Sequence, residues 1–436
     1  MSHISGTGGV DPAEEGPPGG APEAVQDRNL FRSLRNRNYR LLMTGQVVSN
    51  TGNWMQATAQ DWLVLDLTHG SGAALGITAT LQTLPALLFS PYGSVLADRY
   101  PKRRVLMISQ IVMGTLVLVL GLLTVTGSVS LWNVYALAFC LGMVVAVSRA
   151  ASMAFTSEVV GCSNVSNAVG LSSATFNTTM VMGPAAGGLL IAAIGTGPVF
   201  LVNAASFGAM MLGLYLMRED ELYARKPLPR AKGQLREALR HVRERRDLVM
   251  LMTIRLLVTA FGINFAVTNA LMSREVFHTG ASSFGIVTAM MAVGGLVGAL
   301  LSARRAQPDM RVVLAAAAAF SVLVATAGLM PHYWAFAALQ VPTGMAMTTF
   351  TTTVNSLTQL SAPVEMLGRV MGLYLLVTNV SALVGRPLIG WLAEVFGPRS
   401  SLIIGGLASL VSVAGVVAFM APVAAGPIAR KAAPRS

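Results

Sequence analysis

Long apolar stretches separated by short polar connections run along the chain from about residue 39 to residue 421. Each stretch has about the 20 residues that an α-helix needs to cross a hydrocarbon core of about 30 Å. The pattern predicts twelve membrane-spanning helices, at 39–65, 72–96, 105–126, 131–155, 167–194, 197–217, 248–272, 282–303, 312–330, 333–357, 370–394 and 401–421. An even number of crossings places both ends of the chain on the same side of the membrane.

The composition agrees with this pattern. Only 11% of the residues are charged, against about 25% in an ordinary soluble protein. The hydrophobic fraction is 53% and the mean hydropathy is +0.61. We therefore expect an all-α membrane protein rather than soluble domains.

The formal net charge of +12 is explained by membrane topology. If the N-terminus is cytoplasmic, 27 of the 31 Lys and Arg residues lie on the cytoplasmic side, and only Arg274 and Arg399 lie in outer connections. Positive residues concentrate on the cytoplasmic side of membrane proteins. This distribution predicts a multi-pass protein of the bacterial inner membrane with both termini cytoplasmic. A nucleic-acid partner is not expected, because the chain has few aromatic-interleaved basic patches and no soluble module to carry them.

The predicted organisation has five parts: a cytoplasmic tail (1–37), a six-helix bundle (38–217), a linker (218–247), a second six-helix bundle (248–422) and a C-terminal tail (423–436). Residues 1–27 are rich in Gly, Pro, Ala and Glu and contain no Lys or Arg, which predicts disorder and no signal peptide. In the linker, Leu235, Leu239 and Val242 recur at helical spacing among charged residues. They predict a helix that either lies on the anionic inner leaflet or is simply solvated.

The two halves show ordered self-similarity. Gly183-Pro184 is followed by Gly187, and Arg386-Pro387 is followed by Gly390, at a constant offset of 203 residues. The ends of the second and eighth segments are also alike. Internal repeats with Gly- and Pro-interrupted helices are typical of transporters whose substrate site lies between the repeats.

Enzymatic chemistry is not predicted. The chain has no G-x4-G-K-[ST] phosphate loop and only five histidines. Its two cysteines, Cys140 and Cys162, provide neither a metal-binding C-x-x-C spacing nor a disulfide framework. We expect no catalytic residue, no metal and no cofactor.

A cluster of cations with one acid follows the second segment. Positive-inside topology alone explains such a cluster, but an acid beside it can also pair and latch one helix to a neighbour. The run resembles the loop signature of the major facilitator superfamily, G-x-L-A-D-R-x-G-R-R, and departs from it at Ser94 and Pro101. The matching residues are Leu96, Ala97, Asp98, Arg99 and Arg103, with Lys102 in place of an Arg. Of these, the resemblance implies a role in conformational switching for Asp98, Arg99, Lys102 and Arg103.

The fifth segment carries a second resemblance to that superfamily. Its antiporter motif, G-x8-G-x3-G-P-x2-G-G, fits Gly170, Gly183, Pro184, Gly187 and Gly188, with Thr179 in place of the middle Gly. Gly and Pro within the membrane let helices bend and approach closely, so simple packing is an alternative explanation. The resemblance implies the major facilitator fold and a proton-coupled exporter.

Softer patterns at 34–42, 62–65, 367–374 and 387–390 resemble a bacterial drug/proton antiporter-like branch of the superfamily. This branch includes enterobactin-exporter-like proteins and transmembrane secretion effectors. The resemblance covers roughly residues 30 to 420. Arg149 and Glu158 also resemble cytoplasmic gate positions.

Several polar side chains fall within the predicted membrane segments. Gln46, Asn50, Asn53 and Gln60 lie on one face of the first segment, and facing lipid they would be costly. We expect them to line a passage between the halves, although hydrogen bonding between helices explains any single one equally well. Looser candidates for the same passage are Asn177, Asn264, Asn269, Thr348, Thr352 and Asn355.

Ionisable residues within the membrane are rarer and point to function. Burial in a low dielectric disfavours the charged form of a carboxyl, which suits Asp61 as a proton carrier with Arg386 as a partner. A structural pair or an acid at the interface are the alternatives for Asp61. Arg255 is expected to extend toward the cytoplasmic interface, and Glu394 to lie at the outer interface.

These patterns predict a secondary active transporter that works as a monomer in the lipid bilayer. We expect it to exchange protons for amphipathic small molecules such as a drug, a siderophore or a secondary metabolite. The alternatives are an importer of a small nutrient and a non-transporting sensor or scaffold on the same fold.

Overall fold

The computed structural model describes residues 32–161, 165–221, 223, 234–304, 308–363 and 366–424, and within these ranges the chain forms helices and no strands. Residues 1–27, for which disorder is predicted, and the tail from residue 425 lie outside the described residues. The first half contains η1 (Arg32–Arg35), α1 (Arg37–Thr68), α2 (Gly72–Arg99), α3 (Lys102–Val125), α4 (Leu131–Val160), α5 (Val165–Ile194), α6 (Thr196–Tyr215) and η3 (Glu219–Glu221). The second half contains α7 (Gln234–Glu244), α8 (Arg246–Gly262), α9 (Phe265–Leu271), η4 (Met272–Val276), α10 (Ala281–Ala303), α11 (Met310–Ala327), α12 (Tyr333–Ser361), α13 (Leu367–Phe396) and α14 (Pro398–Ala424).

Among the described residues, ten helical stretches are long and apolar enough to cross a membrane. One of them is the composite stretch of α8, α9 and η4, Arg246–Val276. The two remaining predicted segments correspond to α1 and α12, which have 32 and 29 residues. Both are long enough to span a bilayer, but they are more polar than the other ten.

Local sequence signals explain where several helices begin and end. The side chain of Asn36 accepts a hydrogen bond from the backbone N–H of Tyr39 and caps α1, and Ser130 caps α4 in the same way. Gly161 and Gly397 end α4 and α13 with positive φ angles of 68° and 86°. Such conformations are accessible to Gly at little cost.

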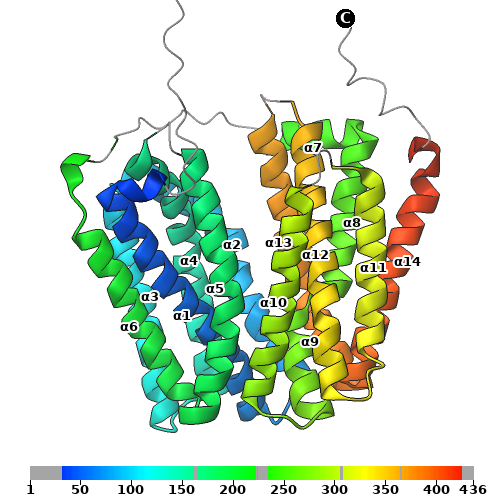
Figure 1. Ribbon diagram of the computed structural model, residues 1–436, viewed down its shortest axis with the longest axis horizontal. Helices are drawn as coiled ribbons and strands as arrows, with labels where there is room; N and C mark the ends of the chain where they lie inside the picture. The colour runs from blue at the N-terminus through cyan, green and yellow to red at the C-terminus, as the bar shows by residue number, and fades with distance from the viewer. Residues whose placement is uncertain are drawn as a thin grey trace, which may run out of the picture.

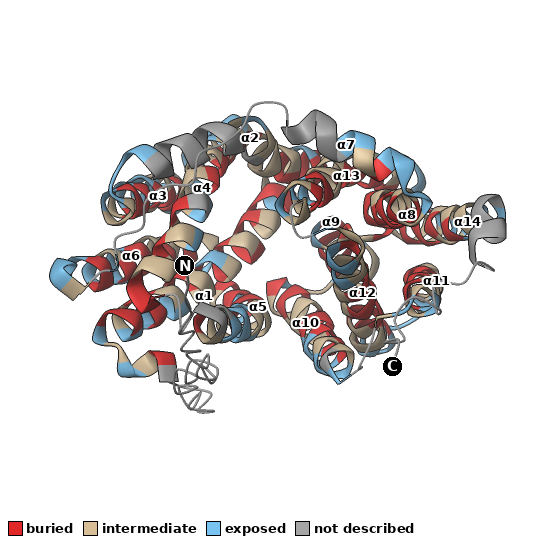
Figure 2. Ribbon diagram, turned by 90° about the horizontal axis from the view of Figure 1, so that it is seen from above, coloured by how far each residue is buried: buried red, intermediate tan, exposed pale blue. Residues whose placement is uncertain are grey.

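The helices form two bundles that stand side by side, with α1–α6 in one and α8–α14 in the other (Figures 1 and 2). The core of the second bundle is one cluster of buried residues drawn from α7 to α14. In the first bundle, one cluster contains only residues of that bundle. The other extends across the boundary to Leu271, Phe284 and Ala393 of the second bundle.

Contacts between the bundles concentrate at one end of the molecule, where α1 ends and α2 begins; we call it the closed end. The opposite end, where α1 begins and α14 ends, is called the terminal end. The ribbons of the two bundles diverge toward the terminal end (Figure 1). The described polar connections within this end, such as the ion pair between Lys102 and Glu158, stay within one bundle.

Two helix crossings hold the bundles together, α2 with α13 and α5 with α10. Both depend on glycines, because their backbones meet without intervening side chains. A Cβ atom on Gly188 of α5 would lie 2.7 Å from the carbonyl oxygen of Ala281, and one on Gly72 of α2 would lie 2.6 Å from that of Gly390. The sequence repeat relates α2 to α10 and α5 to α13. Each crossing therefore joins one helix of the α2/α10 pair to one helix of the α5/α13 pair.

The predicted linker helix is α7, which packs against α8 and α13 at the terminal end (Figure 2). Val242 is buried in the core of the second bundle, while Leu239 is exposed. Leu235 lies outside the described side chains.

Candidate functional site

The centre of the interface between the bundles contains two ionisable residues, Asp61 on α1 and Arg386 on α13. The Arg386 guanidinium reaches across to α2 and donates hydrogen bonds to the carbonyl oxygen of Ala79 at 3.1 Å and to Oγ1 of Thr83 at 2.8 Å. Gly76 allows this approach, because a Cβ there would lie 2.7 Å from the Arg386 carbonyl oxygen. Arg386 therefore ties the second bundle to the first.

Asp61 is partly buried and interacts electrostatically with Arg386. The two groups do not form an ion pair within 4.0 Å, and no hydrogen bond to the Asp61 carboxyl is found among the described residues. The predicted partnership is thus an electrostatic contact between bundles without a direct bond. A carboxyl that is close to a cation and free of fixed hydrogen bonds is able to exchange a proton.

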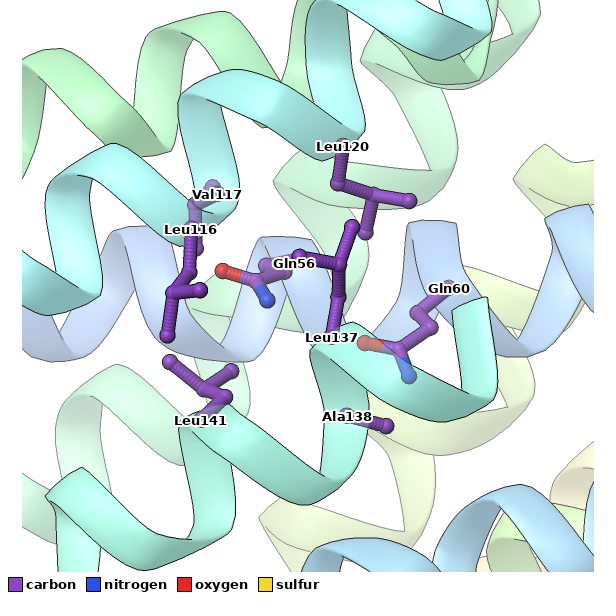
Figure 3. Close-up of a pocket in the computed structure, with 8 residues that line it drawn as sticks. All are labelled: Gln56, Gln60, Leu116, Val117, Leu120, Leu137, Ala138 and Leu141. Atoms are coloured by element: carbon purple, nitrogen blue, oxygen red, sulfur yellow. The ribbon is translucent and has the colours of Figure 1, made fainter. Parts of the chain in front are cut away.

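The polar face predicted for α1 divides between two environments. Gln46 and Asn50 are partly exposed and Asn53 is exposed. Gln60 instead is buried inside the first bundle, where with Gln56 it lines a small cavity of about 10 Å³. Figure 3 shows both amides pointing between the leucines of α3 and α4. Gln60 therefore does not line the predicted passage, because its position on the helix faces α3 and α4.

Hydrogen bonding between α1 and α6 involves residues that the sequence did not single out. Asn203 of α6 is fully buried and donates to Gln56 and, at 3.4 Å, to Asn53. Ser206 donates to Asn203 Oδ1 at 2.7 Å. These contacts show that part of the α1 polar face stabilises the bundle. The sequence signal available for this contact was that Asn203 is a polar residue in the sixth predicted segment, at a depth that matches the polar residues of the first.

The other predicted passage residues have varied surroundings. Asn177 donates to the Ser173 carbonyl of its own helix, and Asn355 accepts from Gln359 at 2.6 Å, also within one helix. Thr352 similarly donates to the carbonyl oxygen of Thr348 at 2.7 Å. These three bonds are local and do not connect one helix to another.

Asn264 and Asn269 lie at a discontinuity that hydropathy does not reveal. α8 ends at Gly262 and α9 begins at Phe265, and Asn264 between them donates to the Ala260 carbonyl at 2.9 Å. Asn269 is 1% exposed, and neither polar atom of its amide has a hydrogen-bond partner among the residues that the structure describes. A π-helical turn, η4, follows directly. Interrupted helices and π-helical turns frequently occur at functional sites of membrane proteins.

Arg255 does not extend to the cytoplasmic interface as expected. Its side chain is buried between α8 and α13, where Nε donates to Oγ1 of Thr378 at 3.2 Å. The guanidinium carbon lies 5.5 Å from the centre of the Tyr374 ring. The charge is retained within the second bundle because these two side chains of α13 provide it with contacts.

The closed end is secured by polar contacts between the bundles. Glu394 of α13 accepts hydrogen bonds from Oγ of Ser71 at 2.9 Å and from the backbone N–H of Ala73 at 3.1 Å, at the start of α2. Arg274 of η4 forms an ion pair with Asp66 of α1. These contacts must break if the closed end opens.

Aromatic side chains extend this closure. Trp62 of α1 stacks on Phe284 of α10 with ring centres 6.4 Å apart, and the Arg274 guanidinium lies 5.6 Å from the Trp62 ring. Asp66, Arg274 and Phe284 were not predicted as site residues. The sequence contained one signal for Arg274, which is one of the two cations in the outer connections.

The predicted switch residues lie at the terminal end. Lys102 pairs with Glu158 at 2.8 Å, and both side chains are about 15% exposed. Arg103 donates to the carbonyl oxygens of Leu214 and Tyr215 and pairs with Glu219. Arg99 and Arg149 are exposed, and Asp98 lies outside the described side chains.

The glycine motif of α5 packs in two directions. Gly183 and Gly187 face α1, where added Cβ atoms would meet the Thr51 carbonyl oxygen at 3.1 Å and Met55 Cα at 3.0 Å. Gly188 faces α10 of the other bundle, while Gly170 faces open space. Pro184 lies within α5. The motif thus allows one helix to pack closely on both its own bundle and the other.

Comparisons with known proteins agree on the kind of protein. The sequence profile of transmembrane secretion effectors matches residues 29–432. The multidrug efflux pump Tap of Mycolicibacterium fortuitum is 26% identical over 393 residues, covering 88% of this chain and 95% of the pump. The enterobactin exporter EntS of Citrobacter koseri is 25% identical over 357 residues, covering 78% of this chain and 81% of the exporter.

A solved structure of the nucleoside transporter NupG superposes with a TM-score of 0.72 at 12% identity. The superposition covers 88% of this chain and 99% of that chain. A likeness at this identity is a likeness of fold.

Proposed function

Because the chain belongs to the transmembrane secretion effector family of the major facilitator superfamily, we propose that it exports amphipathic small molecules in exchange for protons. The all-α major facilitator fold is shown by the family and by the structural likeness. The observation that carries the proposal is the electrostatic interaction between Asp61 of the first bundle and Arg386 of the second, whose guanidinium also bonds α2. The names of the efflux pump and the exporter among the relatives support the outward direction.

Asp61 and Arg386 provide a link between protonation and bundle orientation. When Asp61 is ionised, its attraction to Arg386 favours the arrangement in which α1 and α13 are close. At separations beyond 4 Å and an effective dielectric constant of about 20, this attraction is worth no more than about 4 kcal/mol. Protonation of Asp61 removes it, and about 3 kcal/mol shifts a two-state equilibrium more than a hundredfold.

We assign the terminal end to the cytoplasmic side of a bacterial inner membrane, in agreement with the distribution of Lys and Arg. In this orientation the arrangement in Figure 1 corresponds to the state that loads cargo from the cytoplasm. Release requires the contacts of Glu394 and Arg274 at the closed end to break while the terminal end closes. The monomer contains both bundles and is the proposed functional unit.

The direction of coupling is tested in proteoliposomes with an imposed pH gradient. The probes are ethidium, Nile red and 8-anilinonaphthalene-1-sulfonate, which are cationic, neutral and anionic. A proton antiporter accumulates a probe when the lumen is acidic, whereas a proton symporter does so when the exterior is acidic. Accumulation with an acidic exterior would indicate an importer, and no movement of any probe under either gradient would contradict transport of such compounds.

The role of Asp61 is tested with Asp61→Asn in the same vesicles. We expect gradient-driven accumulation to fall to background while probe exchange without a gradient continues, since the neutral amide mimics the protonated state permanently. The matched control is Asp220→Asn, which neutralises an exposed acid in η3. Undiminished gradient-driven accumulation in Asp61→Asn would remove Asp61 from the mechanism.

A further inference from the structure

Arg255 is a buried cation without a counter-charge among the described residues. Its exposed fraction is 8%, and the described contacts of its guanidinium are Thr378 and the Tyr374 ring. Nη1 is buried and has no hydrogen-bond partner among the described residues. No ion pair within 4.0 Å links Arg255 to a described Asp or Glu. Arg386, by contrast, has two oxygen acceptors and the nearby Asp61.

An unpaired guanidinium in this position requires an explanation. Buried charges in proteins are normally paired, because removing an ion from water costs several kcal/mol. Ionisable groups within membrane segments are usually part of a substrate or ion pathway. A neutral hydroxyl and an aromatic face compensate the charge of Arg255 only in part. The site is therefore suited to a counter-ion that the described part of the chain does not provide.

The position of Arg255 relative to the passage follows from α13. The Arg386 side of α13 faces the first bundle, and Gly368, Gly372, Leu375 and Asn379 precede Arg386 by 18, 14, 11 and 7 residues. These spacings are close to five, four, three and two helical turns, so the five residues share one face.

This face of α13 is open toward the terminal end. Leu375 is 57% exposed, and Cβ atoms added to Gly368 or Gly372 would meet nothing within 4 Å. Tyr374 and Thr378 directly precede Leu375 and Asn379 in the sequence. Because adjacent helix positions differ by about 100° in direction, they lie on the neighbouring face of α13. Thr378 is only partly buried, and its hydroxyl accepts a hydrogen bond from Arg255, so Thr378 connects the buried guanidinium to the border of this open face.

We infer that Arg255 binds the negatively charged group of an amphipathic ligand that enters between the bundles beside Thr378. The ligand class is a molecule with one acidic group, such as a carboxylate or sulfonate, on a largely apolar body. The guanidinium fork can bond both oxygens of such a group, and Leu375 provides apolar surface nearby. This inference rests on the proposed transport function and specifies the chemistry of its cargo.

The test compares two probes of the same shape, 1-naphthylacetate and 1-naphthylacetamide, which differ in charge. Binding to the purified full-length protein in detergent is measured by titration calorimetry. We expect the wild type to bind the carboxylate about ten- to a hundredfold more tightly than the amide, as for a hydrogen bond to a charged group. Arg255→Gln should bind the two probes equally, with its affinity for the amide unchanged.

Two further variants keep the test decisive. Arg255→Lys keeps the charge without the planar fork, so its preference for the carboxylate should be smaller than in the wild type but still measurable, even if Arg255→Gln fails to fold. Arg399→Gln removes another arginine that lies over an aromatic ring, 5.9 Å from Phe277, and should retain the full preference. Equal affinity of the wild type for the two probes, including binding of neither, overturns the inference, as does an undiminished preference in Arg255→Gln.

The binding measurement needs no proton gradient, so it is independent of the transport assay. A carboxylate preference that depends on Arg255, together with probe transport that ignores the pH gradient, would refute proton coupling and retain the anion site. Gradient-driven transport without a carboxylate preference would retain proton coupling and refute the anion site.

Discussion

Removal of the Glu394 carboxylate is expected to open the closed end. Glu394 bonds Ser71 and the backbone N–H of Ala73 at the start of α2, so a side chain of the second bundle caps a helix of the first. Loss of a helix cap costs about 1 kcal/mol, and loss of an anion at a helix N-terminus costs about 0.3–1 kcal/mol. Since Glu394 is exposed, we take about 1 kcal/mol for Glu394→Ala, which shifts the ratio of open to closed states about fivefold.

Spin labels on exposed residues of the two bundles can measure this ratio. Trp132 at the start of α4 and Trp334 at the start of α12 lie at the closed end and are 78% and 67% exposed. Both native cysteines are replaced by Ser, and Trp132 and Trp334 are each replaced by a spin-labelled Cys. Pulsed electron paramagnetic resonance then measures the distribution of distances between the two labels across this end. Glu394→Ala should increase the long-distance population relative to the short-distance population about fivefold.

The matched control is Glu244→Ala, which removes an exposed glutamate paired with Arg240 at 3.0 Å at the terminal end. This variant should leave the distribution at the closed end unchanged. If Glu394→Ala also leaves it unchanged, or moves it toward shorter distances, Glu394 does not hold the closed end together.

Other parts of the molecule give further expected outcomes. Gly188→Leu should abolish probe accumulation in proteoliposomes, because a Cβ there already lies 2.7 Å from the Ala281 carbonyl; normal accumulation would show that the α5–α10 crossing need not close. Gln60→Met should raise the melting temperature without changing transport, because a buried unpaired amide nitrogen costs about 1–3 kcal/mol; a lower melting temperature would indicate that the amide has a partner. Glu158→Lys should destabilise the protein, and adding Lys102→Glu should restore part of the loss if their ion pair matters; thermal unfolding of the single and double variants measures this.

Most of the membrane segments could be predicted because a helix in lipid must be apolar along its whole length. The sequence also showed a cluster of cations between the second and third segments, and Lys102 and Arg103 of this cluster lie at the start of α3. The glycines at 187, 188 and 390 were recognisable from spacing alone, since only small residues let helix backbones touch. The structure adds which backbones they touch.

Hydropathy could not reveal the break at Asn264, because averaging over some 20 residues conceals two residues with non-helical backbone. Nor could it predict that Gln60 turns away from the interface while Asp61, the next residue, interacts with Arg386. Adjacent helix positions differ by about 100° in direction, so neighbours in sequence can serve different purposes. The bonds of Glu394 to α2 join residues more than 300 positions apart, and a single sequence contains no signal for such a pairing.

The two crossings, α2 with α13 and α5 with α10, have a bearing on the origin of the molecule. A six-helix ancestor that associated as a twofold symmetric dimer would have had two identical crossings, as isologous contacts require. In a single chain that contains both halves, each crossing is able to change independently of the other. Gly183 and Arg386 occupy equivalent places in the repeat, yet one packs on its own bundle and the other bonds across the interface. Among the described residues, a charged connection that a symmetric ancestor would have had to carry twice is present only at the crossing of α2 with α13.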